Sequence, residues 1–348
     1  MKLIVGQGLA GTLLALELRK HSELYRVVDG GFGSSGSGVA AGILNPVTGK
    51  RLAKSWRWES FRARAAAAYR EWESLLGLEI FQDTRVLRLF KDPDEHATWE
   101  RKRALPAYAR LFGQRFAPGE AGCGIQDTFG CFEILQAGIL EVQQLLAASR
   151  KLFEDEGTYL GQPFLHGDLH ADGASALWQN EKFSGVVFCE GFRVLDNPWF
   201  NWIPMEPAQG EIQTLRLVTE PPRGILNRGK WLRPNSDGTY QGGATHQWDC
   251  LEEGPTEASE AELKSGIQSI VNGQLHVLKR RTGVRPATKD RRPAIGFHPE
   301  HPCLSVLNGL GAKGSLMAPW LAQHLVSAVL DGQPIDPEVD VQRFLSRP

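Results

Sequence analysis

Three glycines and one acid near the N-terminus have types and spacing with a specific chemical use. Gly6, Gly8 and Gly11 follow an apolar run at residues 2–5 and precede strong helix formers, as in a strand, Gly-x-Gly-x-x-Gly and helix unit. Gly6 would permit a tight turn, Gly8 a close approach of backbone to a pyrophosphate, and Gly11 tight packing of helix on sheet. Asp29 ends a second expected strand about 20 residues later, where a carboxylate binds a ribose hydroxyl. The pattern predicts a dinucleotide site.

A second group of small residues follows the acid. Residues 30–42 read GGFGSSGSGVAAG and lead directly into the apolar Ile43 and Leu44. A flexible linker is the alternative interpretation, but linkers are usually more polar and do not run into apolar residues. We therefore expect a loop and a short helix whose backbone packs against a flat or charged ligand.

The composition favours a globular protein without a strong overall charge. The 348 residues leave room for two domains, and a formal net charge of −1 predicts no broad attraction to nucleic acid or membranes. No apolar run approaches the ~20 residues that cross a bilayer. A cleaved signal peptide would remove the expected strand at residues 2–5, and the five cysteines form no CxxC pair. We therefore expect a cytoplasmic protein without a metal site.

Periodicity divides the chain into two kinds of region. Apolar residues at helical spacing predict helices at residues 57–76, 94–103, 105–112, 138–155, 257–275 and 316–330. Apolar or alternating runs predict strands at residues 2–5, 25–28, 87–90, 161–165, 175–179, 185–189, 210–218, 230–233, 240–247 and 304–308. Alternation and the turn at residues 235–238 indicate an antiparallel sheet between residues 204 and 249, unlike the N-terminal part.

Several stretches carry a resemblance to a known family. They are GQGLAG with Asp29, GSGVAAGILNP at residues 36–46, GVRPATKDRRPAIG at 283–296 and GLGAKGSLMAP at 309–319. In this order they resemble the FAD-dependent D-amino-acid oxidase superfamily, and within it the glycine oxidase and sarcosine oxidase-like branch. The last stretch is also similar to the oxidase domain of a bifunctional enzyme that matures the wobble uridine of certain tRNAs.

The resemblance implies an α/β fold with two domains. A discontinuous Rossmann-like FAD-binding domain would comprise residues 1–77, 133–203 and 280–348. A substrate domain with a mixed, largely antiparallel sheet would comprise residues 78–132 and 204–279.

The resemblance also implies noncovalent FAD, because Gly283 stands near the position where covalently flavinylated relatives have a cysteine. Two positions depart from the family pattern, namely Glu190, where a small residue is usual, and Leu310, where many members have histidine. The implied FAD-binding residues are Gly6, Gly8, Leu9, Ala10, Gly11, Asp29, Gly30, Ser35, Gly38, Ala41, Gly42, Phe164, Gly191, Gly309, Gly311, Ala312, Lys313, Gly314 and Ser315.

Four residues are candidates for the reaction itself. Arg285 matches the residue that binds the substrate carboxylate in glycine oxidase-like members, and a planar guanidinium pairs with both carboxylate oxygens. A structural ion pair is the alternative interpretation of this arginine. Lys313 matches the turn beside the isoalloxazine. His246 and Trp248 are candidates for the wall of a substrate pocket, although aromatic residues on a sheet are often core.

The function that the resemblance implies is FAD-dependent oxidation of the C–N bond of an amine or amino acid that resembles glycine, sarcosine or a D-amino acid. Hydride would pass to the flavin, the imine would hydrolyse, and oxygen or another acceptor would take the electrons. One alternative is oxidation of a carboxymethylaminomethyl group on a tRNA wobble uridine. The near-neutral charge argues against nucleic acid, although basic stretches at residues 279–281 and 289–292 leave room for it. Another alternative is a non-catalytic flavin-binding protein.

Overall fold

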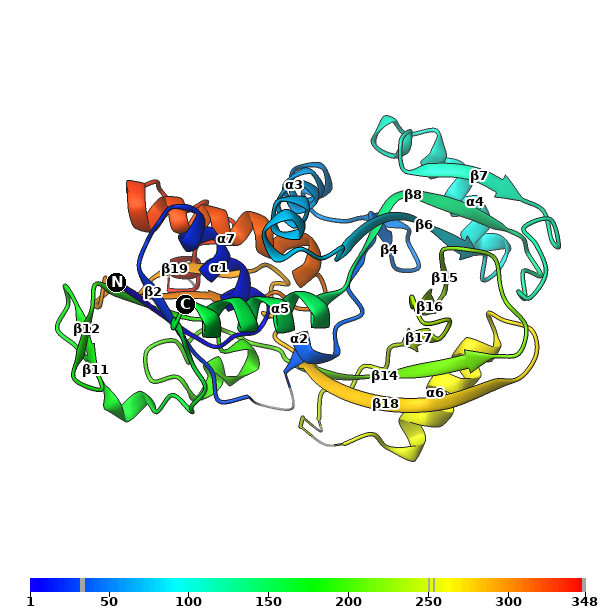
Figure 1. Cartoon of the computed structure of the whole chain (residues 1–348). Helices are drawn as coiled ribbons and strands as arrows, with labels where there is room; N and C mark the ends of the chain where they lie inside the picture. The colour runs from blue at the N-terminus through cyan, green and yellow to red at the C-terminus, as the bar shows by residue number, and fades with distance from the viewer. Residues whose placement is uncertain (32–34, 250, 253, 346–348) are drawn as a thin grey trace.

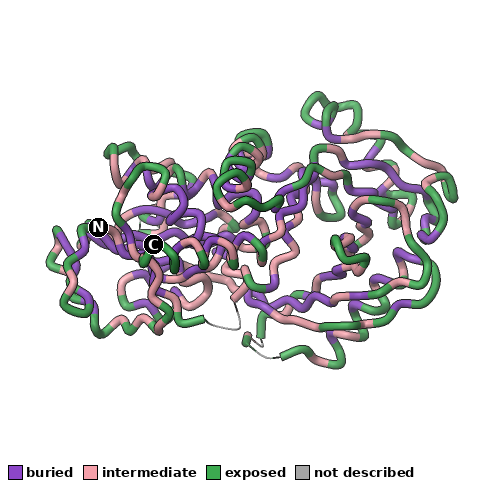
Figure 2. Tube along the Cα trace, viewed as in Figure 1, coloured by how far each residue is buried: buried purple, intermediate pink, exposed green. Residues whose placement is uncertain are grey.

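Two large β-sheets organise the chain, one toward each end of the molecule (Figure 1). The computed structural model describes residues 1–31, 35–249, 251–252 and 254–345. Buried residues follow both sheets and the helices packed on them (Figure 2). Both sheets, with the helices packed on them, therefore contribute to the buried core.

The first sheet is mostly parallel and takes its strands from distant parts of the chain. Its order is β19, β20, β13, β1, β2 and β9, and among these described strands the β19–β20 pair alone is antiparallel. Parallel sheets are covered by helices on both faces, which explains the apolar character of these strands. They span Lys2–Val5 (β1), Tyr25–Val28 (β2), Tyr159–Leu160 (β9), Gly185–Phe188 (β13), Ala294–Phe297 (β19) and Leu304–Asn308 (β20).

Helices on this first sheet pack against one another. Helix α1 contacts both α7 and α5, and α3 packs along α7. The apolar stripe of α3 includes Phe61, Tyr69 and Trp72, all buried, and Gly77 ends the helix in the left-handed conformation with φ of 66°. The helices span Leu9–Lys20 (α1), Trp58–Leu76 (α3), Val142–Asp155 (α5) and Gly314–Asp331 (α7).

Within the described residues, the second sheet has nine strands and is mixed. Its order is β18, β14, β17, β16, β15, β6, β8 and β3, with β7 on β8. Among the strand pairs that the structure describes here, β15 and β6 alone run parallel. Helix α6 (Glu257–Gln268) packs on it. The strands span Ile43–Leu44 (β3), Phe81–Leu89 (β6), Phe112–Phe116 (β7), Cys131–Leu140 (β8), Ala208–Leu217 (β14), Ile225–Arg228 (β15), Lys230–Pro234 (β16), Tyr240–Gly243 (β17) and Leu275–Arg285 (β18).

The predicted α/β class with a mixed, largely antiparallel second sheet is confirmed. Shorter elements complete the structure. The shorter elements are α2 (Gly36–Val39), α4 (Pro93–Arg103), β4 (Val47–Thr48), β5 (Ala53–Lys54), β10 (Leu169–Ala171), β11 (Ala176–Trp178), β12 (Glu181–Phe183) and the 3₁₀ helices η1 (Pro106–Tyr108), η2 (His166–Asp168), η3 (Gly191–Asp196) and η4 (Val341–Phe344).

Two predicted helices include residues that form strands in the structure. The helix expected at 138–155 begins only at Val142, because β8 continues to Leu140 and pairs with β6. Gly138 permits this pairing, since a Cβ there would lie 2.9 Å from the ring of Phe81. The helix expected at 105–112 is reduced to η1, because β7 begins at Phe112.

Two further expectations are wrong at their C-terminal ends, and a third expected strand is not formed by the described residues. The helix expected at 257–275 ends at Gln268, and Gly273 with φ of +91° turns the chain into β18. The strand expected at 240–247 ends at Gly243. The strand expected at 161–165 is absent from these described residues, because Pro163 lacks an N–H for pairing and the paired residues are 159–160.

The expected domain division stays a prediction. Two of its boundaries, at 132/133 and 279/280, fall inside β8 and β18. Both strands belong to the second sheet and extend toward the first (Figure 1). The two parts of the molecule are therefore joined by continuous strands at these places.

Changing Tyr69 to phenylalanine should lower the free energy of unfolding by about 1 kcal/mol. Tyr69 is fully buried, and its hydroxyl donates to the backbone carbonyl oxygen of Ser315 at 2.7 Å, which ties α3 to the start of α7. The midpoint of urea unfolding measures the effect. The matched control is Tyr240→Phe, because the half-buried Tyr240 hydroxyl has no hydrogen bond within the described chain. Equal midpoints for both variants would contradict the prediction.

Candidate cofactor site

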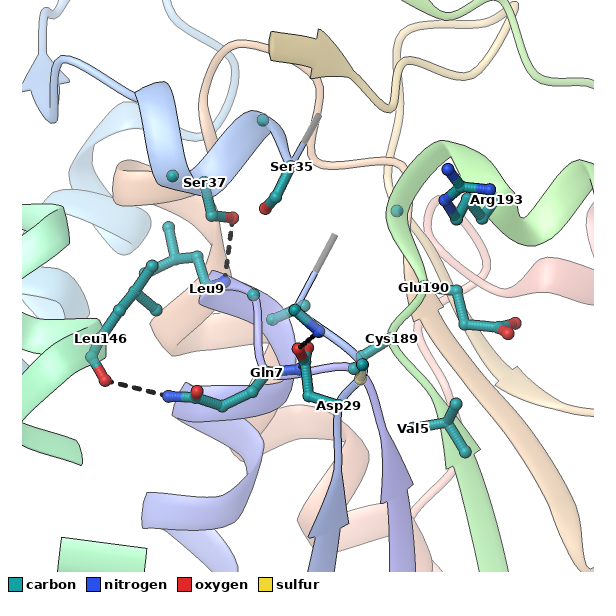
Figure 3. A pocket seen from close by; sticks show the side chains of 18 of the residues that line it. Val5, Gln7, Leu9, Asp29, Ser35, Ser37, Leu146, Cys189, Glu190 and Arg193 are labelled. Atoms are coloured by element: carbon teal, nitrogen blue, oxygen red, sulfur yellow. Dashed lines mark hydrogen bonds between the residues drawn. The ribbon is translucent and has the colours of Figure 1, made fainter. Parts of the chain in front are cut away.

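A cavity of about 700 Å³ opens at the carboxyl ends of β1, β2 and β13. This edge is where open parallel sheets bind their ligands. In Figure 3, Gln7 and Leu9 of the fingerprint lie at the start of α1, and Leu146 of α5 lies on the opposite side of the cavity from Cys189, which follows β13. The predicted residues that line it are Gly6, Gly8, Leu9, Ala10, Asp29, Gly30, Ser35, Gly38, Phe164 and Gly191.

Two glycines of the fingerprint let α1 approach the sheet closely. Gly6 has φ of +99°, and a Cβ there would lie 2.6 Å from the carbonyl oxygen of Cys189. A Cβ at Gly11 would overlap the carbonyl oxygen of Gly6. Gly11 does not line the cavity, so its contribution is the tight helix–strand packing that its position predicts.

The N-terminus of α1 is suited to an anionic ligand. Gly8 is its N-cap and supplies no side-chain hydrogen bond, and no acidic residue stands in the first turn of this described helix. The N–H of Leu9 donates to Oγ of Ser37 at 3.0 Å (Figure 3). The remaining free N–H groups and the helix dipole favour a phosphate at this place. The residues present therefore fit a dinucleotide pyrophosphate.

Asp29 is held in place by backbone donors. Its Oδ2 accepts from the N–H of Gln7 at 2.5 Å, and its Oδ1 accepts from the N–H of Gly31 at 2.6 Å. The carboxylate thus lies at the end of β2 in the cavity wall, where it suits a ribose hydroxyl.

Sequence reasoning missed the contribution of α5. Arg150 donates from Nε to Oε1 of Gln7 at 2.7 Å, and Gln7 donates from Nε2 to the carbonyl oxygen of Leu146 at 2.9 Å. Arg150, Leu146 and Gln143 all line the cavity. Their amphipathic helix could be predicted, but no local signal indicates that it closes the nucleotide cavity.

Ala41 and Gly42 lie outside the cavity lining and connect the loop to the second sheet. The carbonyl oxygen of Ala41 accepts from Arg233 at 2.8 Å. Gly42 has φ of +70°, and a Cβ there would overlap the carbonyl oxygen of Leu140. The geometry thus gives both residues a packing reason, and their role in cofactor binding stays a prediction.

The C-terminal turn, residues 309–315, borders the cavity through one residue. Leu310 lines it, whereas the predicted Gly309, Gly311, Ala312, Lys313, Gly314 and Ser315 do not. Nζ of Lys313 donates to Oγ of Ser55 at 3.1 Å. Burial, and then the positive charge of Arg292, lower the pKa of Lys313. The role of these six residues in FAD binding stays a prediction.

Arg285 lies between two residues of the cavity wall, Val284 and Pro286. Its guanidinium lies over Gly210 of β14 and donates from Nη1 and Nη2 to the carbonyl oxygen of Thr245, at 3.2 Å each. Burial lowers the pKa of Arg285. The structure gives this guanidinium no carboxylate partner among the described residues, which disfavours the structural ion pair.

His246 and Trp248 lie near Arg285 but not in the cavity lining. Their rings are 6.1 Å apart, and 53% of Trp248 is exposed. His246 is exposed as a residue, yet desolvation of its ring and then the charge of Arg285 lower its pKa to about 4. The imidazole of His246 is therefore neutral at neutral pH.

The described residues contain no cluster of His, Cys, Asp and Glu that could hold a metal ion. Within the same residues, no helix is long and apolar enough to span a bilayer. Part of the basic character of residues 279–281 and 289–292 is cancelled, because Arg280 pairs with Glu211 and Arg291 pairs with Glu206.

The sheet is mostly parallel, its glycine-rich turn leads into a helix whose N-cap is a glycine, and a carboxylate follows the next strand. These features define a dinucleotide-binding α/β protein. Residues 3–328 match the family described as FAD dependent oxidoreductase (DAO), and the chain belongs to this family. It is thus an FAD-dependent oxidoreductase, as the sequence motifs predict.

Relatives of two kinds are similar to this chain. The tRNA 5-methylaminomethyl-2-thiouridine biosynthesis bifunctional protein MnmC of Aromatoleum aromaticum is 26% identical over 99% of this chain and 60% of its own length. The chain thus spans about 60% of that relative. The glycine oxidase of Pseudomonas aeruginosa is 21% identical over 95% of both chains.

Solved structures have the same fold at low sequence identity. Glycine oxidase from Geobacillus kaustophilus gives a TM-score of 0.83 with 21% identity, over 97% of this chain and 96% of that chain. Iminodiacetate oxidase from Chelativorans sp. BNC1 gives a TM-score of 0.81 with 21% identity, over 99% of this chain and 98% of that chain.

Gly8→Val should yield a protein that folds but purifies without yellow colour. The Cβ position of Gly8 already lies 3.2 Å from Oγ of Ser37, so valine methyl groups would fill the space for a pyrophosphate. The ratio of flavin to protein absorbance measures the loss. Gly254→Val is the control, because a Cβ there meets nothing within 4 Å. A Gly8 variant with normal flavin content would contradict this prediction.

Proposed function

We propose that this enzyme oxidises the C–N bond of a small amine or amino acid with a carboxylate group. The observation that carries the proposal is the half-buried Arg285, which lies at the junction of the cofactor cavity and the second sheet without an acid partner in the described chain. The likeness to glycine oxidase over 95% of the chain supports this substrate class. FAD, when bound, supplies the two-electron acceptor.

The residues of this chain would then bind and orient the substrate. The planar fork of Arg285 suits both oxygens of a carboxylate, and partial burial strengthens the pairing. The carbonyl oxygen of Thr245 holds the guanidinium in place. His246 and Trp248 would contribute a neutral, partly aromatic wall. Lys313 at the start of α7 would add positive charge beside the flavin, together with the N-terminus of that helix.

In this proposal, residues 1–77, 133–203 and 280–348 form the FAD-binding domain. Residues 78–132 and 204–279 form the substrate domain. It includes noncovalent FAD, because Gly283 offers no nucleophile and packs against the carbonyl oxygen of Ser35. It also places the protein in the cytoplasm, a location supported by free thiols at Cys123, Cys131, Cys189 and Cys303.

A second candidate is oxidation of a carboxymethylaminomethyl group on tRNA. The similarity to MnmC of Aromatoleum aromaticum over 99% of this chain favours it. RNA binding usually requires a basic surface, and the ion pairs of Arg280 and Arg291 reduce the charge of the stretches that would supply one. We therefore favour a small-molecule substrate.

Anaerobic mixing of the holoenzyme with glycine, sarcosine, proline and D-amino acids should bleach the flavin absorbance with one of these classes. Absorbance scans before and after addition measure reduction without requiring a particular electron acceptor. A yellow protein that none of them reduces, but that a tRNA substrate reduces, would replace the proposal by the second candidate. A yellow protein that neither reduces would indicate a non-catalytic flavin-binding protein.

Arg285→Lys should raise KM for the reducing amino acid by about tenfold or more while leaving flavin content unchanged, because lysine keeps the charge but loses the planar fork. Initial rates over a range of substrate concentrations measure the change. Arg291→Lys is the matched control, since Arg291 pairs with Glu206 at the surface. An unaltered KM would show that Arg285 only holds the backbone at Thr245.

A further inference from the structure

The cofactor cavity contains an acid that the dinucleotide fingerprint does not use. Glu190 stands two residues after the end of β13 and lines the cavity next to Cys189, across from Leu146 (Figure 3). Its side chain is only 10% exposed. An acid this buried needs partners, because removing its hydration is costly. The partners of Glu190 therefore indicate what it does.

Both oxygens of the Glu190 carboxylate are hydrogen-bonded. Oε1 lies 2.8 Å from Nε2 of His166, and Oε2 accepts from Nδ2 of Asn197 at 2.7 Å. The fully buried Asn197 is fixed in orientation, because its Oδ1 accepts from the N–H groups of Trp199 and Phe200 at 2.9 and 3.0 Å. An ionised carboxylate only accepts hydrogen bonds, so Nε2 carries the proton whenever the His166 ring is neutral.

This arrangement leaves the second ring nitrogen of His166 as an acceptor. Nδ1 has no hydrogen-bond partner among the residues that the structure describes. The ring is held by aromatic contacts with Phe164, Phe188 and Trp199. His166 lines the same cavity as Asp29 and Phe164, whose expected ligands are the ribose and the adenine. A fixed acceptor thus stands on the adenosine side of the site.

We propose that Asn197, Glu190 and His166 form a hydrogen-bond relay through which His166 accepts from the exocyclic amine of the FAD adenine. Adenosine offers donors only at this amine and at the ribose hydroxyls, and Asp29 suits the hydroxyls. The phosphates and the adenine ring nitrogens are acceptors and cannot pair with Nδ1. His166 is thus a cofactor-binding residue, and Glu190 and Asn197 are positioning residues.

The test compares FAD with its hypoxanthine analogue, in which an oxo group replaces the amine. Quenching of protein fluorescence in the apoprotein measures both dissociation constants at about pH 8, where imidazole is ordinarily neutral. The unaltered protein should bind FAD about tenfold more tightly than the analogue, because loss of one hydrogen bond with an unsatisfied partner has this size. Equal affinities would overturn the proposal.

Glu190→Gln should reverse this preference rather than only weaken binding. Nδ2 of Asn197 still requires an acceptor, so the new amide must turn its oxygen there and its NH2 toward His166. Nε2 of His166 then accepts, and Nδ1 becomes a donor that suits the oxo group of hypoxanthine. A Glu190→Gln protein that keeps the original preference for FAD would overturn the relay.

Two further variants complete the experiment. His166→Phe keeps a ring among the aromatic contacts and should bind FAD and the analogue about equally, whereas a retained preference for FAD would overturn the role of Nδ1. Glu100→Gln is the matched control, because Glu100 lies 4.0 Å from His96 on α4, outside the cavity. It should keep the preference of the unaltered protein.

Discussion

The structure depends on how closely α1 approaches β1. The absence of a side chain at Gly11 lets the helix come into contact with the backbone of Gly6, so the helix begins directly at the end of the strand. This proximity is what brings free N–H groups to the edge of the parallel sheet. Any Cβ at Gly11 would move the helix away and separate its N-terminus from Asp29 and Ser37, which complete the same site.

The cavity is completed by segments that are far apart in the chain. Gln7 joins the fingerprint to Leu146 and Arg150 of α5, and Asn308 donates from Nδ2 to the carbonyl oxygen of Gly191 at 2.8 Å. These hydrogen bonds lie at the carboxyl edge of the sheet, where β1, β13 and β20 end together. Cofactor binding thus requires the N-terminal, middle and C-terminal segments at the same time.

Local chemistry explains which parts could be predicted. The strand, the glycine-rich turn and Asp29 are close in sequence, and their residue types indicate the backbone conformation that each needs. Alternation predicts the second sheet, although helical spacing also extends a helix into β8, because the apolar residues near Gly138 continue directly into α5. Strand pairing with Phe81 decides that segment, and this partner is distant in sequence.

The contacts of Arg150 and Glu190 could not be predicted, because they depend on tertiary neighbours. Arg150 contacts Gln7 from a helix that enters the site after a long excursion through the second sheet. In the sequence, Glu190 stands out only as an acid in place of a small residue. Its relation to His166 and Asn197 requires η2 and η3 to meet at the cavity, and no spacing rule in the sequence indicates this meeting.

Strand β18 runs without interruption from the second sheet to the cofactor cavity, and this restricts insertions and deletions within it. The strand carries Gly283, which packs against Ser35 beside the cofactor cavity, and ends at Arg285 above Gly210. Side chains alternate between faces along a strand, so inserting or deleting one residue here would point Arg285 to the opposite face. Changes in substrate preference should therefore arise by substitution or by loop lengthening, while the length of β18 stays constant.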